Sequence, residues 1–166
     1  ILLSNYPPSI GMGAGNESRL QSRSIAKVPI VICGAPRFKS LSKKFPQSLA
    51  GQPFVLPTFH SKLRHDLDHF FRVHQIQISP VAETQDTSLQ RLLGFSGVGL
   101  IPIAETAAED LLKEKSLIRI GRLEGVFEEF WLISSVRKNE NPIAAQLMRT
   151  FGTKSNKRLS DRLQSI

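Results

Sequence analysis

The sequence predicts an α/β fold, because short apolar runs alternate along the chain with amphipathic helical patterns. The chain has 166 residues, of which 40% are hydrophobic. Its 22 Lys and Arg residues against 14 Asp and Glu residues give a net charge of +8. This composition is typical of a globular chain with a core for one two-lobed domain or two small domains. Alternating strands and helices also favour largely parallel sheets.

The first third of the chain predicts strands separated by turns and a loop. Apolar runs bounded by Pro, Gly or Asn predict strands at Ile1–Ser4, which we expect to be buried, at Val28–Gly34 and at Phe54–Leu56. Residues Gly11–Ser24 are rich in Gly, Ser and Asn, which predicts a loop. Their glycine spacing does not fit the dinucleotide-binding fingerprint, which requires a third glycine for helix packing directly after a strand.

A helix is predicted most clearly over Ser61–Gln75. Apolar residues recur there at spacings of three and four and form one stripe, made of Leu63, Leu67, Phe70, Phe71 and His74. Ser61 can cap this helix, because its hydroxyl oxygen can accept from a first-turn N–H.

The second half continues the alternation. Asp86 is predicted to cap a helix whose inner face is Leu89, Leu92 and Leu93, and a further helix covers Ala104–Leu112. Pro142 suits the first turn of a last helix that reaches Phe151. Strands are predicted at Ile76–Val81, Gly97–Pro102, Leu117–Ile120 and Phe127–Val136.

Charge and cysteine usage restrict the class of protein. The seven basic residues between Arg19 and Lys44 fall mostly in predicted loops, so a solvated surface explains them better than a DNA-reading face. A single cysteine, Cys33, fits a reducing cytoplasm. No apolar run is long enough to span a membrane, and no export leader opens the chain. Because the chain begins without Met, we expect it to be part of a longer protein.

The sequence shows no catalytic set, metal site or cofactor motif. His65 and His69 are four residues apart, but their face points away from the apolar stripe, and Asp66 and Asp68 would more simply neutralise them. No serine lies in a Gly-x-Ser-x-Gly elbow, and no phosphate loop is present. Cys33 lies inside a predicted strand, as a buried small hydrophobe would. We therefore expect a protein that is not an enzyme and has no cofactor.

Polar residues that follow strands or begin helices form a candidate ligand site. In open α/β sheets, small ligands bind at the carboxyl ends of strands, and helix N-termini there suit an anion or a carbonyl oxygen. Capping alone also accounts for Ser61 and Asp86. The candidate segments are Ser4–Asn5, Thr58–Ser61, Asp86–Ser88 and Gly97–Gly99.

Three motifs that contain or adjoin these segments resemble the effector-binding domain of LysR-type transcriptional regulators. The motifs are Leu49–Pro57, Glu83–Asp86 and Gly97–Pro102, in this order and spacing. Residues Ile118–Glu124 with Phe127–Phe130, and Ile1–Asn5, are more similar to the branch that activates antiporter genes in response to sodium. The resemblance covers about Ile1 to Phe151.

The resemblance implies a fold like that of type II periplasmic binding proteins, with two α/β lobes joined by two crossover strands. Residues 1–33 and 131–166 would form lobe I, which is incomplete, and 34–130 would form lobe II. A winged helix-turn-helix DNA-binding domain would be absent from this sequence. By motif position, the effector would contact Ser4, Asn5, Thr58, His60, Ser61, Asp86, Thr87, Gly97 and Val98.

The function that the resemblance implies is sensing of a small solute or ion, with Na+ as one candidate. Oxygen ligands for Na+ would come from Asn5, Ser61, Asp86, Glu83 and the pair Glu128–Glu129. The partners implied are the effector, DNA through the missing domain and further copies in a homodimer or homotetramer, with no membrane. A stand-alone solute-binding protein of the same fold is the alternative.

Overall fold

The computed structural model describes residues 2–5, 20–135, 142–143, 145–146 and 150. The chain divides into two compact units, of which one comprises Ile1–Lys27 and Glu129–Ile166 and the other comprises Val28–Glu128. Two long strands, β2 (Leu20–Gly34) and β6 (Ile118–Ser135), continue from one unit into the other. Among the described residues, no helix is long and apolar enough to cross a membrane.

The first unit is built on the pairing of β1 (Leu2–Ser4) with β6. The two strands are antiparallel, with Leu2 opposite Ile133 and Ser4 opposite Trp131. The prediction that this first strand is buried is wrong, because the Leu2 and Leu3 side chains are each 60% exposed. Strand pairing satisfies backbone groups and does not require burial of the side chains.

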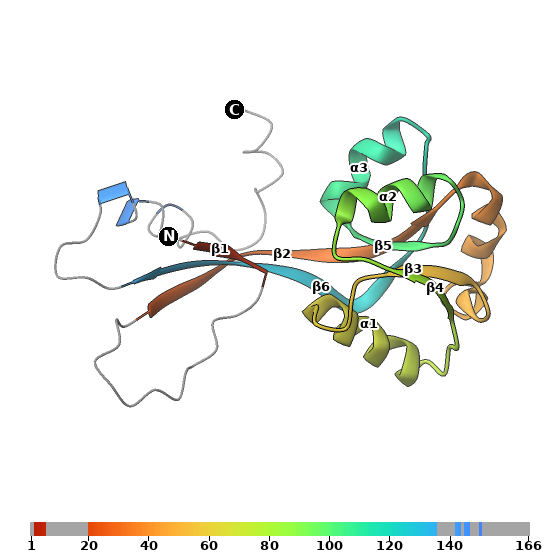
Figure 1. Ribbon diagram of the computed structural model, residues 1–166, viewed down its shortest axis with the longest axis horizontal. Helices are drawn as coiled ribbons and strands as arrows, with labels where there is room; N and C mark the ends of the chain where they lie inside the picture. Colours follow the sequence, from red (N-terminus) through yellow and green to blue (C-terminus); the bar gives the residue numbers. More distant parts are fainter. Residues whose placement is uncertain (1, 6–19, 136–141, 144, 147–149, 151–166) are drawn as a thin grey trace. The chain divides into compact units, whose positions relative to one another are not determined.

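The second unit contains most of the elements that Figure 1 labels. Their order along the chain is η1 (Pro36–Lys44), η2 (Gln47–Leu49), β3 (Pro53–Leu56), α1 (Lys62–Val73), β4 (Ser79–Glu83), α2 (Thr87–Phe95), β5 (Ile101–Ala104) and α3 (Glu105–Lys113).

Strand directions in the second unit decide which loops lie at the same edge of the sheet. β3 and β4 are parallel, and Phe54 also forms a parallel bridge to Leu100, just before β5. The larger sheet has the order β1-β6-β2-β5, in which β1 is antiparallel to β6 and β2 is antiparallel to β5. The prediction of largely parallel sheets therefore holds for the β3–β4 pair and is wrong for the larger sheet.

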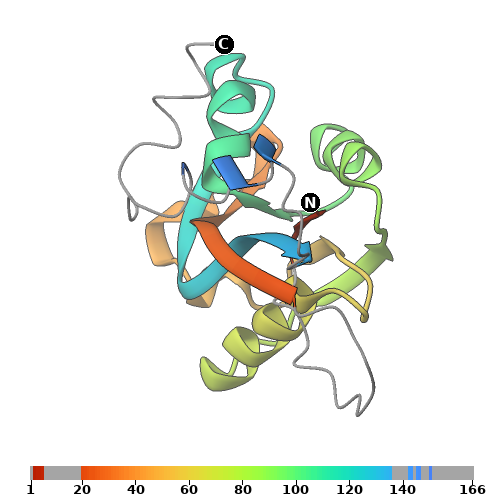
Figure 2. The ribbon, with the colours of Figure 1, turned by 90° about the vertical axis from the view of Figure 1, so that its left-hand side faces the viewer.

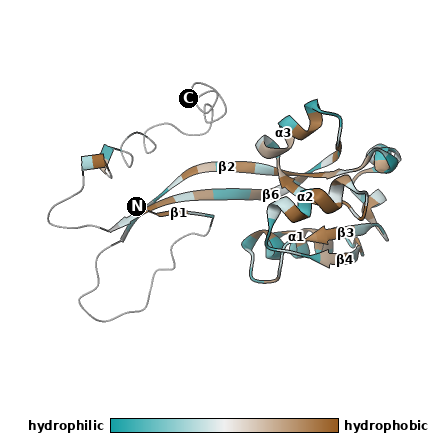
Figure 3. Ribbon diagram, turned by 45° about the horizontal axis from the view of Figure 1, so that its top comes forward, coloured by the Kyte–Doolittle hydropathy of each residue, from teal (hydrophilic) through white to brown (hydrophobic). Residues whose placement is uncertain are grey.

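Helices cover both faces of the β3–β4 pair. In Figures 1 and 2, α1 lies on one side of these strands, and α2 and α3 lie on the other. The Phe54 ring of β3 meets the Phe71 ring of α1 edge-on, with 5.4 Å between ring centroids. Its neighbour Val55 belongs to a buried cluster with Cys33 and Ile101. Since successive side chains of a strand point to opposite faces, β3 is apolar throughout, as its brown colour in Figure 3 shows.

Several predicted boundaries shift for local reasons. Residues 20–24, predicted as loop, belong to β2, and the strands predicted at Leu117–Ile120 and Phe127–Val136 merge into β6, which ends at the last described residue before a gap. The strand expected from Ile76 begins at Ser79, after Gln75 takes a positive φ of 55°. The described residues between 142 and 150 are helical, as predicted, and the remainder of the predicted range lies outside the described residues.

The inner face predicted for α2 is right for Leu93, which packs against the buried cluster, and wrong for Leu89 and Leu92. Leu89 and Leu92 are 43% and 58% exposed, whereas Gln90 and Gly94 are buried. Gly94 faces Ile101, and a Cβ added there would lie 2.9 Å from the Ile101 Cδ1 atom. Close packing against β5 therefore selects a small residue at the contact and turns the two leucines outward.

Candidate functional site

The loop between β3 and α1 holds the first part of the candidate site. Ser61 is the N-cap of α1, as predicted, and its hydroxyl oxygen accepts a hydrogen bond from the Arg64 backbone N–H at 3.2 Å. The Ser61 backbone N–H donates to the Thr58 carbonyl oxygen at 3.0 Å. The Thr58 hydroxyl is inaccessible to water and has no hydrogen-bond partner among the described residues. His60 is exposed in the same loop.

The loop between β4 and α2 holds the second part. Asp86 caps α2, as predicted, and its Oδ1 atom accepts from the Ser88 and Leu89 backbone N–H groups at 2.7 Å and 3.3 Å. The Thr84 hydroxyl accepts from the Asp86 N–H at 3.0 Å, which fixes the turn before the helix. Thr87 is the first residue of α2 and is exposed.

The two helix starts share one edge of the sheet. Because β3 and β4 are parallel, their carboxyl ends lie at the same edge, and the Thr84 N–H donates to the Leu56 carbonyl oxygen at 3.0 Å there. Each strand then leads into the N-terminus of a helix, α1 or α2. Unpaired first-turn N–H groups and the helix dipole make this edge favourable to negative charge or to acceptor oxygens.

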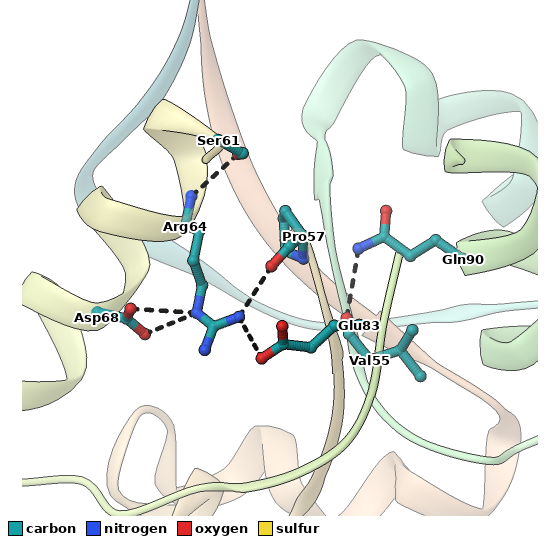
Figure 4. Close-up of polar contacts among 7 residues, drawn as sticks. All are labelled: Val55, Pro57, Ser61, Arg64, Asp68, Glu83 and Gln90. Atoms are coloured by element: carbon teal, nitrogen blue, oxygen red, sulfur yellow. Dashed lines mark hydrogen bonds and ion pairs between the residues drawn. The ribbon is translucent and has the colours of Figure 1, made fainter. Parts of the chain in front are cut away.

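A buried arginine joins the two loops at this edge, as Figure 4 shows. Arg64, in the first turn of α1, is 4% exposed. Its Nη1 atom donates to the Glu83 carboxylate at 2.7 Å and to the Pro57 carbonyl oxygen at 2.9 Å, and its Nε atom donates to Asp68. The Phe59 ring lies over the guanidinium at 4.0 Å. The end of β4 is thereby fixed to the start of α1.

The charge of Arg64 is maintained although the side chain is buried. Burial by itself lowers its pKa, but the hydrogen bonds to Glu83 and Asp68 outweigh that effect and raise the pKa above its ordinary value. A second buried polar side chain, Gln90 of α2, donates from its Nε2 atom to the Val55 carbonyl oxygen at 3.3 Å (Figure 4). Both residues position the helix starts, and no local sequence pattern distinguishes either of them.

Two predicted residues lie at the other edge of the strands. Gly97 and Val98 precede β5, which runs parallel to β3, so they lie near its amino end. Arg37 of η1 donates to the Gly97 carbonyl oxygen, and Gly97 has a positive φ of 73°. The expectation that this segment follows a strand or begins a helix is wrong, and it does not converge with Ser61 and Asp86.

The remaining predicted residues lie in the first unit. Ser4 is the last residue of β1, and Asn5 forms the bend that follows. Their role in effector binding, like that of the residues in the second unit, stays a prediction.

The described residues hold no group of three or more His, Cys, Asp or Glu side chains that could hold a metal ion. The acids expected to neutralise the histidines pair elsewhere, since Asp66 accepts from Lys62 at 2.6 Å and Asp68 accepts from Arg64. Cys33 is fully buried, and burial raises the pKa of its thiol to about 12, so the thiol is protonated.

The arrangement defines a class of protein. Two compact units connected by two long strands, with helix N-termini at the carboxyl edge of parallel strands, have the fold of a periplasmic-binding-protein-like domain. The chain belongs to the LysR substrate binding domain family, whose model matches residues 9–155.

Comparison with curated proteins gives a transcriptional activator as a relative. The transcriptional activator protein NhaR of Escherichia coli is 25% identical over 108 residues, which are 65% of this chain and 36% of that protein. This chain therefore spans about a third of the length of that curated relative.

Solved structures share the fold. The regulatory domain of CcmR from Synechocystis, in complex with 2-PG, has a TM-score of 0.66 and 14% identity, covering 90% of this chain and 70% of that one. DarR from Vibrio fischeri, in complex with DNA, has a TM-score of 0.62 and 15% identity, covering 84% of this chain and 47% of that one.

Proposed function

We propose that this chain is the effector-sensing part of a LysR-type transcriptional regulator in the cytoplasm and does no chemistry itself. A small solute would bind against the helix starts at Ser61 and Asp86 and favour one arrangement of the two units. The change would pass to a winged helix-turn-helix DNA-binding domain elsewhere in the same protein. The observation that carries the proposal is the shared edge of β3 and β4, from which α1 and α2 both begin.

The proposed mechanism is a population shift. A ligand moves such an equilibrium only by its difference in affinity for the two arrangements. The lobe bounds we propose, 34–130 and 1–33 with 131–166, place the change of lobe within β2 and β6. Both strands continue from one unit into the other, so they would carry such a change.

Two more specific proposals concern which genes the regulator controls and whether Na+ is its effector. Regulation of sodium/proton antiporter genes is proposed from the resemblance of Ile118–Glu124 and Phe127–Phe130 to the sodium-responsive branch of the family. The similarity to NhaR supports a transcriptional activator. Na+ as the effector would need free oxygen ligands, but several candidates already accept hydrogen bonds. Asp86 caps α2, Glu83 accepts from Arg64, and Glu129 pairs with Lys27 at 3.3 Å. An uncharged or anionic solute therefore fits this edge better.

We also propose that the regulator associates with a second copy through the exposed face of α2. Leu89 and Leu92 lie about one turn apart and are both largely exposed, although most leucines of such a helix would be turned inward. In the full-length protein, Leu92→Lys should weaken self-association, measured by sedimentation velocity. An unchanged sedimentation profile would place the interface elsewhere.

The central experiment uses the full-length regulator and a fragment of its own promoter. We expect small solutes that raise the unfolding temperature of the regulator also to change its affinity for the promoter. Thr87→Lys, which places a bulky cation at the α2 start, should abolish both responses and leave basal DNA binding unchanged. His69→Lys, exposed on the middle of α1, is the matched control and should leave both responses intact. Loss of both responses in the control, or retention in Thr87→Lys, would contradict the proposal.

A further inference from the structure

The short helix η1 of the second unit carries four cationic side chains on nine residues. They are Arg37, Lys39, Lys43 and Lys44, and all four residues are exposed. The sequence contains no Asp or Glu from residue 18 to residue 65. None of the four cations forms an ion pair with the residues that the structure describes. Their positive charge is therefore available to a negatively charged partner.

The start of η1 is fixed to the body of the second unit. Phe38 is buried, and a Cβ added at Gly34 would lie 2.9 Å from the Phe38 Cδ2 atom. Arg37 donates to the carbonyl oxygen of Gly97, which precedes β5. Because β5 continues a segment that runs parallel to β3, this contact lies at the edge opposite to the starts of α1 and α2. The cations of η1 thus form a surface that is separate from the candidate functional site.

The geometry of η1 places cations along its exposed side. In a 3-10 helix, residues three positions apart lie above one another, and each residue advances the helix by about 2 Å. Arg37, Ser40 and Lys43 therefore form one exposed row that is about 12 Å long. Lys39 lies in the row beside it, and the buried Phe38 belongs to the row that faces the interior. A DNA strand carries one phosphate for about every 3.4 Å of helix axis, so the exposed row spans several phosphates.

The composition of this surface favours a phosphate backbone over a protein as its partner. Protein interfaces are centred on apolar or aromatic side chains and are depleted in lysine. In the described part of the chain, none of the exposed large apolar side chains belongs to η1, and three of its four cations are lysines. Lysine, arginine and serine side chains commonly contact DNA phosphates, and these contacts do not depend on base sequence. This role also differs from that of a base-reading face.

We infer that η1 binds the phosphate backbone of DNA that the DNA-binding domain of the same regulator holds. The inference rests on the proposed function, which supplies the DNA, and adds to it a second contact that is independent of sequence. Each phosphate contact releases condensed counterions, so its contribution to affinity falls as the salt concentration rises. The surface strengthens binding to every sequence by the same factor and leaves the choice of promoter to the other domain.

The test measures the affinity of the full-length regulator for a fluorescent fragment of its own promoter, by anisotropy, at a series of KCl concentrations. Lys43→Gln combined with Lys44→Gln removes two cations and keeps polar side chains. The slope of log affinity against log salt should become less steep by about one for each lysine that contacts a phosphate. With both contacts removed, the loss of affinity between about 50 and 200 mM KCl should be about tenfold smaller than for the unmodified regulator.

Two variants serve as controls. Lys113→Gln combined with Lys115→Gln removes the same charge from exposed positions at the end of α3 and should leave the slope unchanged. Lys43→Arg combined with Lys44→Arg keeps the charge of η1 and should keep the slope. Affinity for a DNA fragment of unrelated sequence should fall by the same factor as affinity for the promoter when the two η1 lysines are neutralised. Far-UV circular dichroism confirms that each variant is folded.

Three results would overturn the inference. One is an unchanged slope when Lys43 and Lys44 are neutralised, and another is an equal change in the α3 control, which would assign the effect to net charge alone. The third is unchanged DNA binding with weaker transcription by purified RNA polymerase, which would make an acidic protein surface the partner of η1. All three leave the response of promoter affinity to solutes, and hence the proposed function, intact. A full-length protein that does not bind its promoter would overturn both.

Discussion

Removal of the Arg64 guanidinium tests how the candidate site is held together. Arg64→Met keeps an apolar stem of similar length but removes the donors to Glu83, Asp68 and the Pro57 carbonyl oxygen. Loss of one partner of a buried ion pair costs about 3–5 kcal/mol. Here the Asp68 and Glu83 side chains remain 45% and 35% exposed, so water can solvate the carboxylates that are left. We therefore expect a smaller loss of about 2–3 kcal/mol.

Urea unfolding followed by far-UV circular dichroism measures this loss as a lower midpoint at an unchanged m-value. The matched control is Arg72→Met on the same helix, where the arginine is exposed and donates to His69 at 3.1 Å. Its effect should stay within about 0.5 kcal/mol. Equal losses for the two variants would refute the claim that the Arg64 network fixes the end of β4 to the start of α1.

Three further predictions concern the core and the pH dependence of stability. The Cys33 thiol has a pKa of about 12 in the folded chain and about 8.5 in the unfolded chain. The unfolding free energy should therefore fall as the pH rises above about 8.5, because only the unfolded chain then loses the thiol proton. In urea titrations, Cys33→Ala should remove this dependence of the unfolding free energy on pH. The hydrogen bond from Arg122 lowers the pKa of the Glu105 carboxyl in the folded chain below its ordinary value. The ionised carboxylate therefore stabilises the folded chain at pH values above the pKa of Glu105 in the unfolded chain, and this stabilisation is lost as the pH falls through the pKa of Glu105 in the folded chain. Glu105→Gln should remove this loss of stability at acid pH. A Cβ at Gly99 would lie 3.0 Å from the Pro53 carbonyl oxygen, so Gly99→Ala should lower the unfolding free energy by about 1–3 kcal/mol, measured by the same titration.

Features set by neighbouring residues could be predicted from the sequence. The caps at Ser61 and Asp86 follow from spacing and hydrogen bonding within a few residues, and the structure confirms them. The apolar stripe predicted for α1 is confirmed for Leu67, Phe70 and Phe71, which are buried, and is wrong for His74, which is exposed. The burial of Cys33 was predictable for the same reason, since a β-branched apolar run surrounds it. These signals do not depend on how distant elements pack.

Features that are set by contacts between distant parts of the chain could not be predicted from the sequence. The sequence does not distinguish Arg64 from an exposed helix residue, because its partner Glu83 lies 19 positions further along the chain. Which face of α2 turns inward depends on Ile101 packing against Gly94, and no local pattern contains that contact. The sequence also does not separate Gly97 and Val98 from the helix starts, because the direction of β5 relative to β3 is set by the pairing of the strands in the sheet.

The central claim is that a small solute binds where α1 and α2 begin. The most direct measurement is the amide chemical-shift change of the 15N-labelled chain on titration with small solutes. We predict saturable shifts at Thr58–Arg64 and Thr84–Leu89 with one common affinity. Shifts confined to the opposite edge, around Arg37 and Gly97, would contradict the claim.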